Sequence, residues 1–467
     1  MVQNATRAGV AALLVVFAAR TSNAATLDPH TEVQGTDITE VDVRSAGHEW
    51  RTVPWGELDE TPRELGSYDL RIEVDAGPEG ATLWLPACAG RSAVSVDGRR
   101  VSTSPGPVAE RLLPGRHEAG LTITVSRYEK RIACGDRPRV GAPRTTVEGL
   151  GVLSYSSPHA AKGGGRAVVY VPPGHDVRRP ASVLVGAHPW NGSMWTYAAY
   201  AQLLGEARAR DVVLLMPSGL GNSLYTADAE DEVLRAMDAL SSAIAVDPSA
   251  VSIWGASMGG AGATTIAFHH PDRFAGVTSF FGDSKYDLQT YVRAILPDEA
   301  VAHRVNAIDV VDNARSLPVL LVHGEDDRTS PIRQSEILAE AMRARGFSVR
   351  FDRVPGVGHS AALVARYLAQ LVAAAATARA EAYPPRVTYR STRPSDTGAY
   401  GIRIVRADPS RDAFVDVERV GGVVHVRRSE GVRAIWLAPG ALGTNSATAP
   451  VVVQDGAPVE VRWGAPP

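Results

Sequence analysis

A serine between glycines is the residue of this sequence best placed to do chemistry. Residues 255–260 read Gly-Ala-Ser-Met-Gly-Gly, so Ser257 stands at the centre of a G-x-S-x-G motif. An apolar stretch at residues 250–254 precedes the motif, and a helix-like stretch at residues 261–269 follows it. A sharp turn from strand to helix exposes the hydroxyl group, and the glycines on both sides avoid collisions with the neighbouring backbone. The sequence therefore predicts Ser257 as a nucleophile.

Two later loops offer the groups that would activate this serine. A serine hydroxyl attacks a carbonyl group only when a base takes its proton and an acid orients that base. Residues 323–327 read His-Gly-Glu-Asp-Asp after an apolar stretch, and residues 356–360 read Gly-Val-Gly-His-Ser. The chain order of serine, acid and histidine predicts His359 as the base. Chemistry alone leaves the acid open among three carboxylates, which are Glu325, Asp326 and Asp327.

Other residues compete for the two supporting roles. Asp283 follows another predicted strand and is a further candidate acid, although a helix cap or a turn would also explain it. Four histidines compete with His359: His188, His269, His270 and His323. We expect His269 and His270 to be polar groups at the C-terminal end of a helix. We expect His323 to have a structural role at the end of a strand.

Strands and helices alternate around these residues, from about residue 151 to residue 382. Five apolar stretches are typical of strands that are buried on both faces of a sheet: residues 182–185, 211–216, 250–254, 276–281 and 318–322. Helix-like stretches lie between them, for example at residues 197–210 and 230–244. The alternation predicts an α/β domain with a doubly wound, mostly parallel sheet, whose ligands bind beyond the carboxyl ends of the strands.

With its motifs in this order, the chain from about residue 165 to residue 375 resembles an α/β-hydrolase. It is most similar to secreted serine esterases related to prolyl oligopeptidase catalytic domains, feruloyl esterases and polyhydroxybutyrate depolymerases. The resemblance matches Ser257 to the nucleophile, Asp327 to the acid of the H-G-x-x-D segment and His359 to the base of the G-H loop. These motifs are specific for the superfamily and not for a substrate.

The resemblance also implies an oxyanion hole with two N–H donors. One donor is expected to be the backbone of Met258, the residue after the nucleophile, and the other to come from the loop at residues 186–192. Relatives often have His-Gly at the start of that loop, whereas this chain has His188-Pro189. Because proline has no N–H group, we expect the backbone of Trp190 to be the second donor. The Trp190 indole would line a substrate subsite or pack on the sheet edge.

The first residues of the chain predict export. Arg7 precedes an apolar run at residues 8–19, and Ser22 and Ala24 are small residues at the positions that a signal peptidase recognises. The run is shorter than the roughly 20 residues that a membrane-spanning helix needs. We therefore expect a signal peptide at residues 1–24, no membrane span, and a secreted protein, either extracellular or periplasmic.

Two further regions show the period-two alternation that is typical of antiparallel strands. We expect residues 25–150 to form a domain like a β-sandwich or jelly roll, residues 151–382 the hydrolase domain, and residues 383–467 a small β module.

Cys88 and Cys134 are the two cysteines of the chain. In an oxidising compartment they predict one disulfide.

The composition of the chain limits the classes of molecule that it is expected to bind. The chain has 467 residues, with 48 Lys and Arg against 51 Asp and Glu, and this net charge of -3 gives no basic excess for binding nucleic acid. No metal-ligand spacing, phosphate-binding loop or dinucleotide motif occurs, so we expect no metal and no cofactor. The whole pattern predicts a serine hydrolase that cleaves small or polymeric carboxylic esters. Two alternatives stay open: a serine peptidase like prolyl oligopeptidase, and a noncatalytic protein that binds a polysaccharide or polyester and carries a vestigial hydrolase domain.

Overall fold

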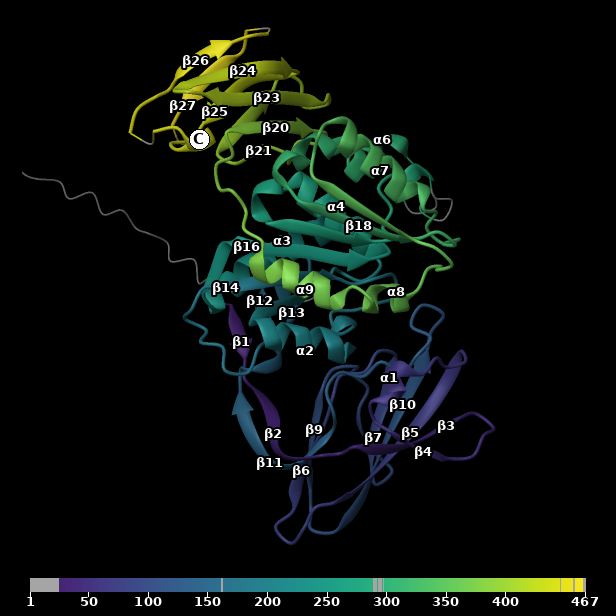
Figure 1. Ribbon diagram of the computed structural model, residues 1–467. Coiled ribbons are helices and arrows are strands. Elements are labelled where there is room, and N and C mark those ends of the chain that lie inside the picture. The colour runs from purple at the N-terminus through teal and green to yellow at the C-terminus, as the bar shows by residue number, and fades with distance from the viewer. Residues whose placement is uncertain are drawn as a thin grey trace, which may run out of the picture.

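The computed structural model describes residues 25–160, 163–288, 292, 296, 298–445, 447–456 and 458–464. The predicted signal peptide at residues 1–24 lies outside the described residues. Three bodies follow one another along the molecule (Figure 1): a β-rich body at one end, an α/β body in the middle and a second β-rich body at the other end. Within the described residues, no helix is both long enough and apolar enough to cross a membrane.

A nine-stranded mixed sheet forms the α/β body. Its strands, in spatial order, are β1 (Thr26–Asp28), β12 (Gly149–Ser156), β13 (Gly164–Val171), β15 (Val212–Pro217), β14 (Ala181–Ala187), β16 (Val246–Ala256), β17 (Gly276–Phe280), β18 (Val319–Gly324) and β19 (Val349–Val354). The strands from β15 to β19 pair in parallel, and β1, β12 and β13 add antiparallel pairs. The expected α/β-hydrolase-like fold is confirmed at this level.

Helices cover both faces of this sheet, which explains why its strands are continuously apolar. All six residues of β15 are buried, for example. One face packs against α3 (Asp228–Ala243), α4 (Met258–His269) and α7 (Arg333–Ala344). The other face packs against α2 (Ala201–Arg210), α8 (Ala361–Ala365) and α9 (Leu368–Thr377). Helical structure is interrupted between α8 and α9 and ends at Thr377.

Two antiparallel sheets build the N-terminal body. One has the order β4 (Arg51–Pro54), β3 (Glu40–Ser45), β5 (Gly66–Asp75), β10 (Arg116–Val125), β7 (Arg91–Val96) and β8 (Arg99–Ser102). The other has the order β2 (His30–Asp37), β11 (Arg139–Thr146), β6 (Ala81–Leu85) and β9 (Val108–Leu112). Both sheets contribute to one hydrophobic core, with Leu70 and Ile123 from the first sheet and Leu83 from the second. Cys88 and Cys134 form the predicted disulfide at the edge of this core.

The N-terminal body is joined to the α/β body by two chain segments, each with one strand in either body. The first described strand, β1, pairs with β12 in the hydrolase sheet, and the strands that continue from them, β2 and β11, pair in the N-terminal body. Residues 25–150 were expected to form one separate domain. The structure instead places Thr26–Asp28 at the edge of the hydrolase sheet, because these residues find their hydrogen-bonding partners in residues 152–154.

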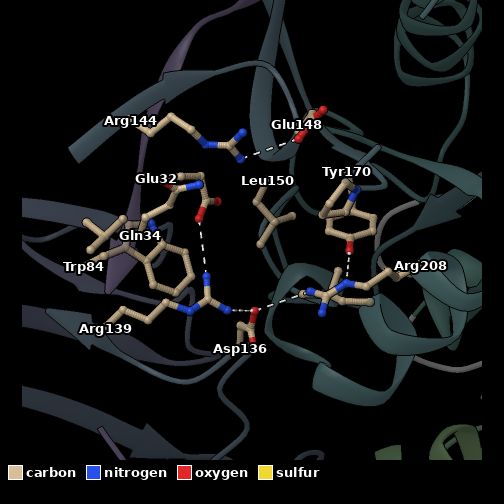
Figure 2. Close-up of a pocket in the computed structure, with 14 residues that line it drawn as sticks. Glu32, Gln34, Trp84, Asp136, Arg139, Arg144, Glu148, Leu150, Tyr170 and Arg208 are labelled. Atoms are coloured by element: carbon tan, nitrogen blue, oxygen red, sulfur yellow. Dashed lines mark hydrogen bonds and ion pairs between the residues drawn. The ribbon is translucent and has the colours of Figure 1, made fainter. Parts of the chain in front are cut away.

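Ion pairs add to this joint around a cavity of about 170 Å³. Figure 2 shows Asp136 between two guanidinium groups, Arg139 from the N-terminal body and Arg208 from α2. The Asp136 carboxylate lies 2.5 Å from Arg139 and 3.4 Å from Arg208, and the Arg208 Nε–H also donates to the Tyr170 hydroxyl at 3.3 Å. Because these charges are paired with one another, we interpret the residues around this cavity as a structural contact between the two bodies.

Two four-stranded sheets form the C-terminal body. Their orders are β20 (Arg386–Ser391), β23 (Ala413–Val420), β24 (Val423–Glu430) and β26 (Val451–Gln454), and β21 (Gly398–Ala399), β22 (Ile402–Arg406), β25 (Val432–Leu437) and β27 (Glu460–Trp463). A buried ionic network attaches this body to the hydrolase. Arg393 pairs with Glu230 and with Asp396, and Asp396 lies 3.0 Å from His269 at the end of α4.

Candidate active site

Ser257 sits on a strained turn between β16 and α4. Its backbone has φ 57° and ψ -122°, a conformation that ordinary residues rarely adopt. The glycines of the motif are required by close packing. A Cβ atom on Gly255 would lie 2.3 Å from the backbone of Gly259, and one on Gly259 would lie 1.8 Å from the carbonyl oxygen of Ala187. The motif therefore brings the serine turn against the end of β14.

The structure brings Ser257, His359 and Asp327 together in a hydrogen-bonded chain. The Ser257 Oγ atom lies 2.9 Å from His359 Nε2, and His359 Nδ1 lies 2.7 Å from Asp327 Oδ2. The three residues come from the turns and loops after β16, β19 and β18, which end at the same edge of the parallel sheet. This arrangement can polarise a serine hydroxyl toward an imidazole that a carboxylate orients.

Asp327 is buried and held as a carboxylate. Burial opposes its ionisation, but the His323 imidazole 3.6 Å away and the hydrogen bond to His359 outweigh this effect and bring the pKa of Asp327 well below its usual range. The backbone N–H groups of Thr329 and Ser330 donate to its other oxygen at 2.8 Å and 2.9 Å. Asp327 is therefore a fixed negative charge beside His359.

The competing acids have other surroundings. Glu325 and Asp326 are exposed to solvent, and Glu325 pairs with Arg353 at 3.0 Å. Asp283 is buried and accepts a hydrogen bond from the Ser330 hydroxyl at 2.5 Å. The hydrogen bond to His359 is thus made by Asp327.

The competing histidines are engaged elsewhere. Both nitrogens of His188 face backbone carbonyls, those of Pro189 and Ser218. His323 is fully buried, with Nδ1 at 2.8 Å from the Ser335 hydroxyl and Nε2 at 2.8 Å from the Ser330 carbonyl. His269 and His270 do lie at the C-terminal end of α4, where they pair with Asp396 and Glu230.

The expected oxyanion donors flank the serine turn. Met258 is the first residue of α4, and Trp190 lies in the loop after β14, whose backbone touches the Gly259 position. Within the described part of the chain, neither the Met258 N–H nor the Trp190 N–H has a hydrogen-bond acceptor. Trp190 is 37% exposed and lines a cleft beside the serine turn, in agreement with a subsite role for its indole.

Tyr197 is a buried residue of the site that the sequence pattern did not indicate. Its hydroxyl accepts a hydrogen bond from the backbone N–H of Ala256 at 3.1 Å and donates one to the carbonyl of Ala187 at 2.9 Å. Its ring stacks on Trp254, with the centroids 4.2 Å apart. Tyr197 therefore ties the residue before the nucleophile to the start of the oxyanion loop.

Two further aromatic residues surround His359. The Phe281 ring lies 4.6 Å from the imidazole between centroids, and the Tyr128 ring lies 6.2 Å from it. Tyr128 belongs to the N-terminal body, and its carbonyl accepts a hydrogen bond at 3.1 Å from Ala361, just after the histidine loop. No motif connects these residues with the site, because their approach depends on how the two bodies pack.

Residues 221–374 match the model of the prolyl oligopeptidase family. This segment contains Ser257, Asp327 and His359. Among curated proteins, acyl-protein thioesterase 1 of Gibberella zeae is 38% identical over 50 residues. That alignment covers 11% of this chain and 21% of the relative, so it spans about a fifth of the relative's length.

Solved structures of serine hydrolases are similar to about half of the chain. An S-formylglutathione hydrolase from Agrobacterium tumefaciens is 19% identical, with a TM-score of 0.42, over 49% of this chain and 95% of that chain. A ferulic acid esterase is 17% identical, with a TM-score of 0.41, over 49% and 97% of the two chains. Dipeptidyl peptidase 4 of Porphyromonas gingivalis is 14% identical, with a TM-score of 0.39, over 48% and 35%. With the family match over residues 221–374, the α/β body is a serine hydrolase domain of the α/β-hydrolase superfamily.

Proposed function

We propose that this protein is a secreted serine hydrolase that cleaves carboxylic esters through an acyl-enzyme. The observation that carries the proposal is the hydrogen-bonded chain from Ser257 through His359 to Asp327, with distances of 2.9 Å and 2.7 Å. In this proposal Ser257 is the nucleophile, His359 the general base and acid, and Asp327 the group that orients the imidazole and stabilises its protonated form.

In the first half of the reaction, Ser257 Oγ attacks the ester carbonyl carbon while His359 Nε2 takes the hydroxyl proton. The carbonyl oxygen becomes an oxyanion, which the backbone N–H groups of Met258 and Trp190 would bind. Loss of one such donor typically costs about 3 kcal/mol of transition-state stabilisation. The oxyanion then reforms the carbonyl group, the bond to the alcohol oxygen breaks, and His359 returns the proton to the leaving alcohol.

In the second half, a water molecule takes the place of the alcohol. His359 removes a proton from this water, whose oxygen attacks the acyl carbon. Collapse of the second tetrahedral intermediate breaks the bond to Ser257 Oγ, and the imidazole returns the proton to the serine. The products are a carboxylic acid and the free enzyme, so no cofactor is needed for the atoms and charges to balance.

A peptidase acting on short peptides is the second candidate, and the match to the prolyl oligopeptidase family favours it. The same residues would serve both reactions. Enzymes with a gating β-propeller carry four to eight four-stranded blades. The described N-terminal body has instead one six-stranded and one four-stranded sheet, which supports the esterase as the first candidate.

Secretion is part of the proposal. The expected signal peptide at residues 1–24 supports it, and so does the Cys88–Cys134 disulfide, since such bonds persist in oxidising compartments. Expression of the full chain in a bacterial host with a periplasm, followed by N-terminal sequencing of the exported protein, would test it. A protein that keeps residues 1–24 and stays in the cytoplasm would contradict this part.

A fluorophosphonate probe tests the hydrolase chemistry. We expect covalent labelling of the wild-type protein and none in Ser257→Ala, whereas Ser410→Ala, which changes an exposed serine of the C-terminal body, should label normally. Turnover of simple alkyl esters should exceed that of aminoacyl-proline amides. A folded protein that does not label would refute the proposal, and turnover of amides without esters would reverse the order of the two candidates.

A further inference from the structure

A cleft of about 550 Å³ lies between the N-terminal body and the loop that carries Trp190. The N-terminal body contributes Ser126 and Tyr128 to its lining, and the hydrolase domain contributes Trp190, Ser193 and Trp195. The cleft is therefore formed by both bodies, and neither body alone would provide it.

Two residues that line this cleft connect it with the proposed active site. The loop that lines it on the hydrolase side includes the expected oxyanion donor, Trp190. On the other side, the Tyr128 ring lies 6.2 Å from the His359 ring and 6.4 Å from the Phe281 ring. A substrate whose carbonyl group lies at Ser257 would thus have the cleft next to it for the remainder of the molecule.

The lining combines aromatic rings with hydroxyl donors. Trp190 is partly exposed, and Trp195 and Tyr128 are half-buried, so ring faces and edges are accessible along the walls. The hydroxyl oxygens of Ser126, Ser193 and Thr196 each accept a backbone N–H, at 3.1 Å, 3.3 Å and 2.9 Å. Within the described residues these three hydroxyls donate to no protein acceptor, so a ligand in the cleft can accept from them in place of water.

The walls of the cleft are fixed in position. Arg91 is buried, and its guanidinium donates to the carbonyl of Pro86 at 2.7 Å and to that of Ser104 at 2.7 Å, and also to Gly106. Gly106 packs against the Trp195 ring so closely that a Cβ atom there would lie 2.7 Å from it. The loop around Ser104 therefore supports Trp195 from the N-terminal side, and the subsite is preorganised.

We infer that this cleft is the substrate subsite that sets the specificity of the enzyme, and that it binds a ring bearing hydroxyl groups. Aromatic side chains stack on flat rings, and the serine and threonine hydroxyls can donate to hydroxyl oxygens carried by such a ring, whereas an alkyl chain offers them no acceptor. The inference rests on the proposed ester hydrolysis at Ser257. A hydroxylated aromatic ring and a sugar share this chemistry, and the experiment separates them.

Four esters with unactivated alcohols test the inference on the full chain. Ethyl acetate has no ring. The alcohol side of 2-(4-hydroxyphenyl)ethyl acetate carries an aromatic ring, and the alcohol side of methyl 6-O-acetylglucoside is a sugar. Methyl 3-(4-hydroxyphenyl)propanoate carries its ring on the acyl side.

The variant to be tested is Ser126→Phe, which places a large side chain in the cleft from the N-terminal body. The matched control is Ser92→Phe, because Ser92 is exposed and follows Arg91 on the opposite face of β7.

We expect Ser126→Phe to lower kcat/KM about tenfold or more for at least one ring ester and to leave ethyl acetate within about twofold. Ser92→Phe should leave all four values unchanged. The ring ester whose kcat/KM falls shows whether the cleft binds an aromatic ring or a sugar, and whether that ring belongs to the acyl or the alcohol part of the substrate. Equal effects on all four esters, or no effect on any, would overturn the inference while hydrolysis itself persists. A wild-type protein that turns over none of them and resists the fluorophosphonate would refute the proposed function instead.

Discussion

The hydroxyl of Tyr197 accepts a hydrogen bond from the backbone N–H of Ala256, the residue immediately before Ser257. The same hydroxyl donates to Ala187, the last residue of β14. Strands β14 and β16 are paired up to Ala187 and Gly255, and beyond this pair they separate toward the oxyanion loop and the nucleophile turn. One buried hydroxyl group thus fixes the spacing of two segments that have to act on the same carbonyl group.

Tyr197→Phe should lower kcat about tenfold to a hundredfold, because one buried N–H and one buried C=O lose their partner where the two segments separate. KM should change little, and the affinity for a boronic acid that mimics the tetrahedral intermediate should fall in parallel with kcat. The control is Tyr389→Phe, which removes an equally buried hydroxyl that donates to His269 at 3.2 Å. If both variants lost thermal stability and neither lost kcat, Tyr197 would have a purely structural role.

Asp327→Asn should reduce kcat by about four orders of magnitude, since the amide no longer provides the charge that orients His359. Asp326→Asn changes an exposed side chain in the same loop and should retain nearly full activity. Steady-state kinetics on one alkyl ester would compare the two. A large loss of activity in Asp326→Asn together with an active Asp327→Asn would show that Asp326, and not Asp327, is the acid.

Gly259→Ala should abolish activity, because the added methyl group would lie 1.8 Å from the Ala187 carbonyl and would push β14 and the nucleophile turn apart. Gly205→Ala is the matched control. Gly205 lies in α2 with open space around it, and alanine there should stabilise the helix by about 1 kcal/mol. Thermal unfolding and fluorophosphonate labelling of both variants measure these effects, and normal labelling of Gly259→Ala would contradict the packing argument.

Attachment of the C-terminal body should weaken in acid. Burial opposes ionisation of Glu230, but His270, Arg393 and His269 lower its pKa from 4.5 to about 2. A lowered folded pKa means that ionised Glu230 contributes its full stability above pH 4.5 and loses it as the pH falls toward 2.

Glu230→Gln should therefore be less stable than wild type by about 3 kcal/mol at pH 7. The difference should shrink as the pH falls through this range, as followed by urea unfolding. Asp238→Asn, an exposed residue of the same helix, should show only a small difference at every pH. A constant gap between wild type and Glu230→Gln down to pH 2 would contradict the assignment.

Local patterns in the sequence were sufficient to predict the features that depend on neighbouring residues. The glycines around Ser257, the apolar stretches of the parallel sheet and the alternating strands of both β bodies follow from backbone geometry and burial. The order of Ser257, Asp327 and His359 placed them at the ends of strands that the fold brings to one edge. Their catalytic roles stay predictions until the variants are measured.

Features that depend on distant contacts were not predictable in this way. Tyr197 lies in a segment that the sequence pattern describes only as helical, and its hydroxyl acquires its partners from two strands. Tyr128 reaches His359 through the packing of two bodies, and Thr26–Asp28 pairs with residues more than a hundred positions later. No periodicity within one segment specifies which other segment it will meet.

The paired strands β1 with β12 and β2 with β11 leave the N-terminal body anchored by both of its ends. A body on a single flexible linker would swing freely, whereas here two chain segments, with one strand pair in each body, limit bending and twisting. Cutting the chain near Pro29 would release one of the two anchors while every catalytic side chain stayed in place. Such a nicked enzyme should still hydrolyse the smallest esters but discriminate less well among larger ones, because the N-terminal wall of the cleft would be held less firmly.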